Sequence, residues 1–174
     1  MQMHDHEPRA RSGGVAKFMI DPTVQAARSL KLHIQYNQKR ENNMTNIELV
    51  QGYFQSLDEN KPELLDGILA ADWKAIPGTA EGLGGQKKNV AFLNSRFENF
   101  SYKIKELIES KDGQTVVALA ELGGIQVAEF LGIQPTNKKI AIDTVVVSRI
   151  KDGKIYETYH LENFMSAQKQ LTAQ

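Results

Sequence analysis

The chain has 174 residues, of which 21 are basic and 21 acidic, and it contains no Cys. A formal charge of zero argues against a protein that holds nucleic acid on a large phosphate-neutralising surface, so we expect no nucleic-acid partner. The absence of Cys excludes disulfides, thiolate metal sites and a Cys nucleophile. With 41% hydrophobic residues the chain is typical of a globular protein, and no apolar run is long enough to suggest a membrane partner.

Residues 1–43 differ in composition from the rest of the chain. They hold seven basic and four acidic residues, which leaves 14 basic and 17 acidic residues for 44–174. They also contain three of the four histidines and lack the continuous apolar run of a secretory signal. We predict that 1–43 is a disordered leader or an over-long start, and that 44–174 forms one domain. The alternative is a basic targeting or anchoring arm.

Helical patterns come first in 44–174. Thr45 and Glu48 have the spacing of a capping box, and apolar residues at helical spacing follow over 47–57. A second helix is predicted to begin at Lys61-Pro62, because proline suits the first helical position. Its apolar face would consist of Leu64, Leu65, Ile68 and Leu69. The Gly-rich and Pro-containing segment 74–86 is predicted to be a loop, followed by a third helix over 86–99.

After residue 100 the apolar period changes to two, which is typical of strands. The pair Asp152-Gly153 favours a tight hairpin turn, and Asn137 suits a left-handed turn position. A last short helix is predicted over 163–171. Helices followed by strands indicate an α+β fold, in which helices pack on one face of a curved antiparallel sheet and enclose a cavity. The predicted strands are 102–109, 116–122, 125–131, 140–150 and 155–161.

Two turn motifs resemble those of a known protein family. The segment 129–138, EFLGIQPTNK, and the hairpin 149–157, RIKDGKIYE, resemble those of SnoaL-like polyketide cyclases in the nuclear transport factor 2-like superfamily. The resemblance covers about 45–171. It implies a cone-shaped α+β barrel with a central cavity, usually dimeric and here cytoplasmic. It also implies ring closure by intramolecular aldol attack without cofactor or metal, with an Asp as general acid/base and His residues polarising the substrate.

The positions expected to carry this chemistry depart from the family pattern. The Asp position falls on Val146, and the two His positions fall on Gln126 and close to Ala75. Two hypotheses therefore stay open. The protein is a cofactor-independent cyclase, isomerase or hydrolase of a hydrophobic carbonyl compound, or it is a non-catalytic ligand-binding or dimerising member of the family.

Proton transfer at neutral pH is best suited to a histidine imidazole, and His160 is the single His in 44–174. Strand alternation places it on one face with Tyr156, Thr158 and Glu162. It is then a general base steered by a nearby carboxylate, or alternatively a surface or dimer-interface residue. Glu157, on the opposite face, is the other weak catalytic candidate.

The family resemblance also implies which strand parity faces the cavity, and hence which residues form its walls. Asp143 has the opposite parity and is expected to pair with a Lys or Arg of a neighbouring strand. Glu121 and Glu129 are most simply solvent-side residues, and no ligand spacing indicates a metal site. The residues expected to bind the ligand are Tyr53, Trp73, Gln126, Phe130, Thr144, Val146 and Tyr159, with Ala128 and Ile142 in the same walls.

The strand 140–150 is apolar on both faces. Val145 and Val147 point opposite to Ile142 and Thr144. An apolar outer face needs a cover, because a strand buried on one side only would alternate apolar and polar residues. We therefore expect a symmetric homodimer.

Overall fold

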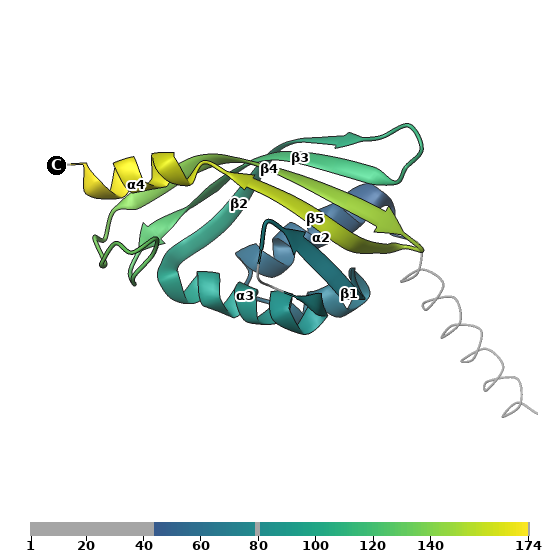
Figure 1. The fold of residues 1–174 in the computed structure, drawn as a ribbon, viewed down its shortest axis with the longest axis horizontal. Coiled ribbons are helices and arrows are strands. Elements are labelled where there is room, and N and C mark those ends of the chain that lie inside the picture. Colours follow the sequence, from purple (N-terminus) through teal and green to yellow (C-terminus); the bar gives the residue numbers. More distant parts are fainter. Residues whose placement is uncertain (1–43, 79–80, 174) are drawn as a thin grey trace, which may run out of the picture. The chain divides into compact units, whose positions relative to one another are not determined.

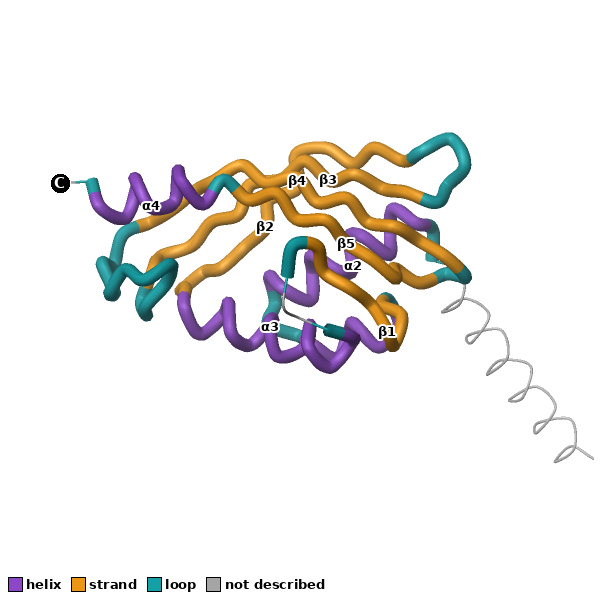
Figure 2. Tube along the Cα trace, viewed as in Figure 1, coloured by secondary structure: helices purple, strands orange, loops and turns teal. Residues whose placement is uncertain are grey.

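The computed structural model describes residues 44–78 and 81–173. The predicted leader 1–43 lies outside the described residues. Figures 1 and 2 show helices on one side of a curved sheet, so the predicted α+β fold is confirmed. In chain order the elements are α2 (Asn46–Asp58), the 3-10 helix η1 (Pro62–Gly67), β1 (Leu69–Ile76), α3 (Gly82–Arg96), β2 (Phe97–Glu109), β3 (Thr115–Gln126), β4 (Lys139–Lys151), β5 (Lys154–Glu162) and α4 (Phe164–Thr172).

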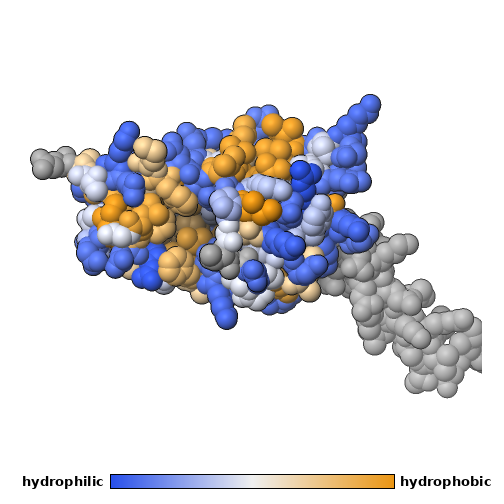
Figure 3. Space-filling model, viewed as in Figure 1, coloured by the Kyte–Doolittle hydropathy of each residue, from blue (hydrophilic) through white to orange (hydrophobic). Residues whose placement is uncertain are grey.

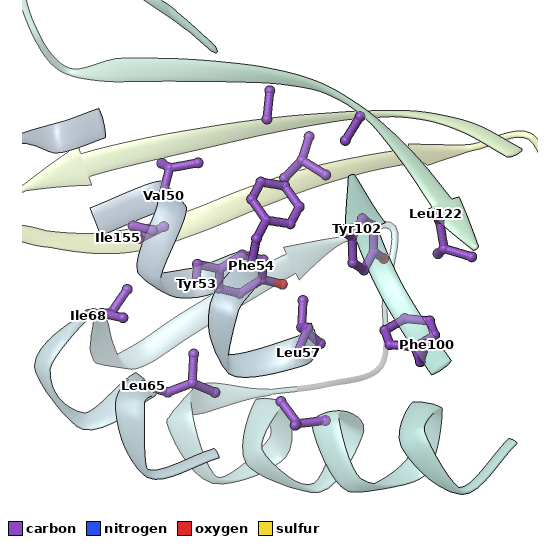
Figure 4. Packing of buried hydrophobic residues seen from close by; sticks show 14 of the residues in the cluster. Val50, Tyr53, Phe54, Leu57, Leu65, Ile68, Phe100, Tyr102, Leu122 and Ile155 are labelled. Carbon is purple, nitrogen blue, oxygen red and sulfur yellow. The ribbon is translucent and has the colours of Figure 1, made fainter. Parts of the chain in front are cut away.

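The five strands form one mixed sheet in the order β1-β5-β4-β3-β2. Strands β2 to β5 pair antiparallel with their neighbours, whereas β1 pairs parallel with β5. On β4 the even-numbered residues from Ile140 to Ile150 are buried, and the odd-numbered ones lie on the outer face. The inner face is covered by α2 and α3, whose apolar side chains meet the strands in a single core (Figure 4).

Helix α2 begins as its sequence predicts. The amide of Glu48 donates to Thr45 Oγ1 at 3.2 Å, and the amide of Thr45 donates to Glu48 Oε2 at 2.7 Å. This capping box satisfies amides that have no partner inside the helix. Tyr53, Phe54 and Leu57 of the helix are then buried against the sheet.

The segment after α2 differs from the expectation. Pro62 does begin a helix, but that helix is a 3-10 turn of six residues, and Leu69 belongs to β1. Leu69 and Trp73 are the buried residues of β1, and a register shift separates Leu69 from Lys74 in the pairing with β5. A spacing of four between apolar residues favours a helix over a strand, so the sequence pattern concealed β1.

The third helix begins earlier than predicted, at Gly82, and ends at Arg96. The two strands predicted over 116–122 and 125–131 are a single strand, β3, followed by a loop. Gly124 explains the continuity, because a Cβ there would lie 3.0 Å from the Cβ of Phe97 on the neighbouring strand. The glycine pair 123–124 therefore permits a close strand approach and does not end the strand.

The loop from 127 to 138 carries its own tight turn. Phe130 and Ile133 exchange two backbone hydrogen bonds at 3.0 and 2.9 Å, and Leu131 and Gly132 both have positive φ. Phe130 and Ala128 therefore lie on a loop and not on a strand as predicted. The predicted left-handed Asn137 and the tight turn at Asp152-Gly153 are confirmed by their positive φ values.

The last predicted helix is also confirmed. Asn163 Oδ1 accepts from the amide of Ser166 at 3.1 Å and caps α4. Gln170 then bonds both backbone groups of Ala141, beyond the point where β5 ends. The helix thereby covers an open edge of β4.

The outer face of the sheet carries two rows of partly exposed apolar side chains, which we call the outer apolar rows. Figure 3 shows apolar surface gathered over these strands. On one border Lys105 pairs with Glu121 and Asp143, and on the other Arg149 pairs with Glu157. The first row is Ile108, Val117, Val147 and Tyr159, and the second is Leu119, Val145 and Leu161.

Candidate functional site

A cavity of about 230 Å³ opens between the helices and the inner face of the sheet. One part of its wall is aromatic, and the other carries hydroxyl, amide, imidazole and carboxylate groups. Such a combination of apolar walls and a few convergent polar groups is typical of a small-molecule site. The lining residues are Tyr53, Leu57, Ala75, Pro77, Gly78, Gln86, Asn89, Leu93, Phe97, Phe100, Tyr102, Leu122, Phe130, His160, Glu162 and Phe164.

His160 lies at the polar end of the cavity. Its Nδ1 is 3.3 Å from Glu162 Oε1, and the two side chains are only 15% and 12% exposed. Its Nε2 lies 3.0 Å from Thr158 Oγ1 and 3.4 Å from the Tyr53 hydroxyl. A carboxylate on Nδ1 favours the tautomer whose proton is on Nδ1, which leaves Nε2 as the basic nitrogen.

The geometry of β5 brings these groups to one face. Arg149 pairs with Glu157 and Ile150 with Ile155, so Tyr156 is an extra residue in a β-bulge. Beyond the bulge Thr158 is buried, and His160 and Glu162 share its face. The predicted face is thus confirmed for Thr158, His160 and Glu162, whereas Tyr156 is exposed because the bulge removes it from the alternation.

Tyr53 connects His160 to helix α3. Its hydroxyl accepts from Gln86 Nε2 at 2.9 Å, and Asn89 Nδ2 donates to Gln86 Oε1 at 3.2 Å. Burial raises the pKa of Tyr53 well above its usual range, the negative charge of Glu162 raises it further, and a hydrogen bond with Thr158 opposes both. The phenol therefore stays protonated at neutral pH and acts as a hydrogen-bond donor or acceptor, not as a base.

The aromatic part of the wall continues to the mouth. Phe130 packs edge-on against Phe97 at 4.8 Å between ring centroids, and its ring lies 6.1 Å from that of Phe164. Phe164 is 40% exposed, so it forms part of the rim. The turn 129–138, whose sequence resembles that of the SnoaL-like family, thus presents Phe130 to the cavity.

Of the sequence-predicted site residues, the structure brings Tyr53, Phe130 and His160 to the cavity. Trp73 is fully buried behind Tyr53, with 6.5 Å between ring centroids. Thr144 and Val146 are on the inner face as predicted, but they are buried in the core and are not part of the lining. Parity gives the face of a strand correctly, but not the part of that face that other side chains cover.

Gln126 has a different environment from the one expected. Its Nε2 donates to the carbonyl of Ile133 at 2.8 Å, and its Oε1 accepts from the amide and hydroxyl of Thr136 at 3.1 and 2.7 Å. The side chain is fully buried. Gln126 therefore fastens the loop that carries Phe130 and has no contact with the cavity.

Glu157 and Tyr159 lie on the outer face of β5. Glu157 Oε1 is 3.4 Å from Arg149 Nε, and the Arg149 guanidinium lies 5.9 Å from the Tyr159 ring centroid. Neither residue reaches the cavity, because the sheet lies between. Glu162 is the carboxylate that accompanies His160.

The three positions that depart from the family pattern lie in three different environments. Ala75 lines the cavity, Val146 is the cross-strand partner of His160, and Gln126 is held by the loop. Asp143 pairs with Lys105 at 2.6 Å across the outer face, so its partner is a Lys as expected, but Lys105 belongs to β2 and not to a strand that neighbours β4. Glu121 of the intervening β3 lies 3.4 Å from the same ammonium. Glu129 is exposed and accepts from Gln134 Nε2.

Several cavity residues have no sequence-based prediction. Gln86 and Asn89 are three apart on α3, so they share one helix face. Their spacing, together with Val90 on the buried side of the helix, was the sequence feature that could have indicated that both face the interior. Phe97, Phe100 and Tyr102 begin β2. Of these three, Phe97 lies in the predicted end of the third helix, Phe100 between the predicted elements and Tyr102 at the start of a predicted strand.

Within residues 44–78 and 81–173, no group of three or more His, Asp or Glu side chains is placed to hold a metal ion. In the same part of the chain, no helix is long and apolar enough to cross a membrane.

Comparison with known proteins agrees with this architecture. The family model of SnoaL-like polyketide cyclases matches residues 47–171, and the chain belongs to that family. No curated protein matches the chain.

Solved structures of low sequence identity share the fold. TsrD from Streptomyces laurentii is 21% identical with a TM-score of 0.69, covering 76% of this chain and 98% of its own. A SnoaL-like polyketide cyclase from Agrobacterium tumefaciens is 12% identical with a TM-score of 0.65, covering 74% and 99%. A protein from Catenulispora acidiphila with a ketosteroid isomerase-like fold is 20% identical with a TM-score of 0.60, covering 71% and 91%.

Proposed function

We propose that this domain binds a hydrophobic carbonyl compound in the cavity and transfers a proton on it without a cofactor, with His160 as general base. The observation that carries the proposal is the set of contacts on the two nitrogens of His160. Glu162 holds Nδ1, while Nε2 faces hydroxyl groups at the polar end of an otherwise apolar cavity. This arrangement replaces the Asp that the family resemblance places at Val146.

The chemistry follows from this geometry. A C–H group next to the carbonyl gives its proton to Nε2, and the electron pair moves onto the carbonyl oxygen to form an enolate. Glu162 stabilises the imidazolium that results. Return of the proton to another carbon isomerises the compound. Attack of the enolate carbon on a second carbonyl closes a ring, and the new alkoxide then takes the proton back from Nε2.

A second candidate function is ligand binding without catalysis. It is favoured by the short distance of 3.0 Å between Thr158 Oγ1 and Nε2, since this hydroxyl already occupies the lone pair of the base. The apolar Val146 and Ala75 favour it as well. Catalysis requires that the substrate displaces Thr158 from Nε2.

Hydrogen exchange on a simple ketone separates the two functions. β-Acetylnaphthalene in deuterium oxide takes up deuterium at its methyl group only through the enolate, and proton NMR measures the rate. We expect exchange above the buffer rate, a loss of roughly a hundredfold or more in His160→Asn, and a smaller loss in Glu162→Gln. Glu157→Gln is the matched control on the outer face and should leave the rate unchanged.

An exchange rate in His160→Asn equal to that of wild type contradicts the assignment of the base. A wild type that binds the ketone but does not accelerate exchange favours the binding function.

We also propose that a second copy of the chain covers the outer apolar rows. The support is their extent over four strands and the ionic borders on both sides. Charged borders around an apolar centre are typical of protein interfaces.

A further inference from the structure

Tyr102 is a buried phenol whose hydroxyl has no hydrogen-bond partner among the described residues. The residue is 6% exposed and lines the cavity, and its recorded bond is that of its backbone amide to Asp58 Oδ1 at 2.6 Å. Figure 4 shows its oxygen on the side of Phe100 and Leu122, which also line the cavity. The fully buried side-chain atoms that lack a partner do not include this oxygen, so the hydroxyl is open to the cavity. A polar group that is open in a mostly apolar cavity wall is placed to recognise a ligand.

The phenol is held rigidly. The bond to Asp58 fixes the backbone of β2 at the end of α2. The Tyr102 ring lies 5.1 Å from that of Phe54 and 5.5 Å, edge-on, from that of Phe100. A donor that is already immobilised loses little conformational freedom when a ligand binds, which favours specific recognition.

Tyr53 differs from Tyr102 in this respect. The hydroxyl of Tyr53 accepts from Gln86 and lies beside His160 Nε2, so protein groups already satisfy it. Tyr102 is therefore the phenol that can direct its hydrogen bond to a ligand.

Charge narrows the kind of atom that Tyr102 can bind. The lining contains the carboxyl of Glu162 and the imidazole of His160, and among the described lining residues there is no Lys or Arg. Burial raises the pKa of Tyr102 well above its usual range, and the charge of Glu162 raises it further, which keeps the phenol a neutral donor. The same negative charge repels an anionic ligand.

We propose that Tyr102 determines specificity by donating a hydrogen bond to a neutral acceptor oxygen of the ligand, a ketone or ester carbonyl, and that the cavity rejects carboxylates of the same shape. The inference rests on the proposed function for the use of the cavity by a carbonyl compound, but not for the role of His160.

Calorimetric titration with three probes of similar shape tests the proposal: β-acetylnaphthalene, β-isopropylnaphthalene and β-naphthoate. Tyr102→Phe should weaken binding of the ketone about five- to tenfold and leave binding of the hydrocarbon unchanged. Tyr156→Phe, at an exposed site outside the cavity, is the control. The naphthoate should bind wild type more weakly than the ketone, and Glu162→Gln should reduce that difference.

An infrared measurement adds a signature that a purely structural role would not give. The carbonyl stretch of the bound ketone should lie at lower frequency in wild type than in Tyr102→Phe. Equal ketone affinity in the two proteins, no ketone binding by wild type, or tighter binding of the naphthoate overturns the proposal.

The outcomes also separate this inference from the proposed function. A ketone affinity that depends on Tyr102 without any deuterium exchange supports the specificity role and contradicts the catalytic one. The opposite result is deuterium exchange that depends on His160, with a ketone affinity and a carbonyl frequency that do not change in Tyr102→Phe. It supports the catalytic role of His160 and contradicts the specificity role of Tyr102.

Discussion

The two faces of strand β5 carry similar side chains in different surroundings. Each face has a carboxylate and a ring, but on the inner face Glu162 meets the imidazole of His160 close to two buried phenols. On the outer face the charge of Glu157 is matched by Arg149, which is 46% exposed. An exposed ion pair contributes about 0–1 kcal/mol and leaves little electrostatic effect on its neighbours.

This difference shows what makes a carboxylate chemically useful. Glu162 has no Lys or Arg partner among the described ion pairs, so its charge acts on Tyr53, Tyr102 and His160. Glu157 has the same functional group and is two positions from Tyr159, but its charge is compensated by the solvent-exposed guanidinium of Arg149. Four predictions test the contrast between the inner and the outer face.

The largest effect is expected for Val146→Asp. Val146 is fully buried on the inner face, so a carboxylate there should destabilise the fold by about 2–4 kcal/mol at neutral pH. Burial raises the folded-state pKa of the new carboxyl. The loss should therefore be smallest below about pH 4, where the carboxyl is protonated in both states and only the cost of burying a neutral polar group remains, and should grow as pH rises.

Urea unfolding at several pH values measures this effect. Ala141→Asp, at an exposed outer position of the same strand, is the control and should change stability by less than about 0.5 kcal/mol. Equal losses in the two variants would contradict the assignment of the faces. Because Val146 is the cross-strand partner of His160, the variant also allows a test for recovered proton transfer.

A smaller loss is expected for Gln126→Ala. The change removes three hydrogen bonds and leaves buried loop groups without partners, so we expect destabilisation by about 1–3 kcal/mol. Gln134→Ala, which removes one exposed bond to Glu129, should be nearly neutral. Ligand affinity should fall only where the loop carrying Phe130 loosens, and a loss of affinity at unchanged stability would mean that Gln126 binds the ligand after all.

Leu161→Glu should have little effect on folding but a clear effect on assembly. Leu161 is 65% exposed in the single chain, so the change costs little there. In a dimer that buries the outer apolar rows, it places a charge in an apolar interface. Light scattering at micromolar concentration should then give a dimer for wild type and a monomer for the variant. Phe92→Gln on α3 is the control, and a monomeric wild type would remove the dimer proposal.

The sequence predicted best those features that depend on neighbouring residues. The capping box at Thr45, the hairpin turn at Asp152-Gly153 and the left-handed Asn137 are local, and each was correct. Strand β1 was missed because its parallel pairing with β5 joins residues about 85 positions apart, and no local pattern encodes it. The glycine pair 123–124 separated two predicted strands, and the nearness of Gly124 to Phe97 of the neighbouring strand is what the local pattern could not reveal.

The candidate site was likewise predictable where it depends on residues close in sequence, and not where it depends on contacts between distant segments. Alternation placed Thr158, His160 and Glu162 on one face and Glu157 on the other, but it could not tell which face meets the cavity. Gln126 was predicted to bind the ligand because its side chain was expected on the inner face of its strand. The sequence pattern does not indicate that the following loop returns and forms hydrogen bonds with the side-chain amide of Gln126. Tyr102 lay in a predicted strand, but the emptiness of its hydrogen-bond environment is a property of the whole fold.

The smallest effect concerns the two buried phenols at high pH. Because burial raises the pKa of Tyr53 and Tyr102, an unfolded chain ionises these phenols near pH 10 while the folded chain keeps them protonated. The stability that they contribute is thus fully present below about pH 10 and is lost as pH rises further. Of the five tyrosines, these two should ionise only as the protein unfolds. An alkaline titration in which ultraviolet absorbance reports phenol ionisation measures this. Tyr53→Phe and Tyr102→Phe should each remove one late phenol, and Glu162→Gln should move the late ionisation modestly to lower pH, since burial remains the larger cause. Two late phenols in either tyrosine variant, the same number as in wild type, would place the buried tyrosines elsewhere. A titration indifferent to Glu162→Gln would mean that the inner carboxylate does not act on the cavity.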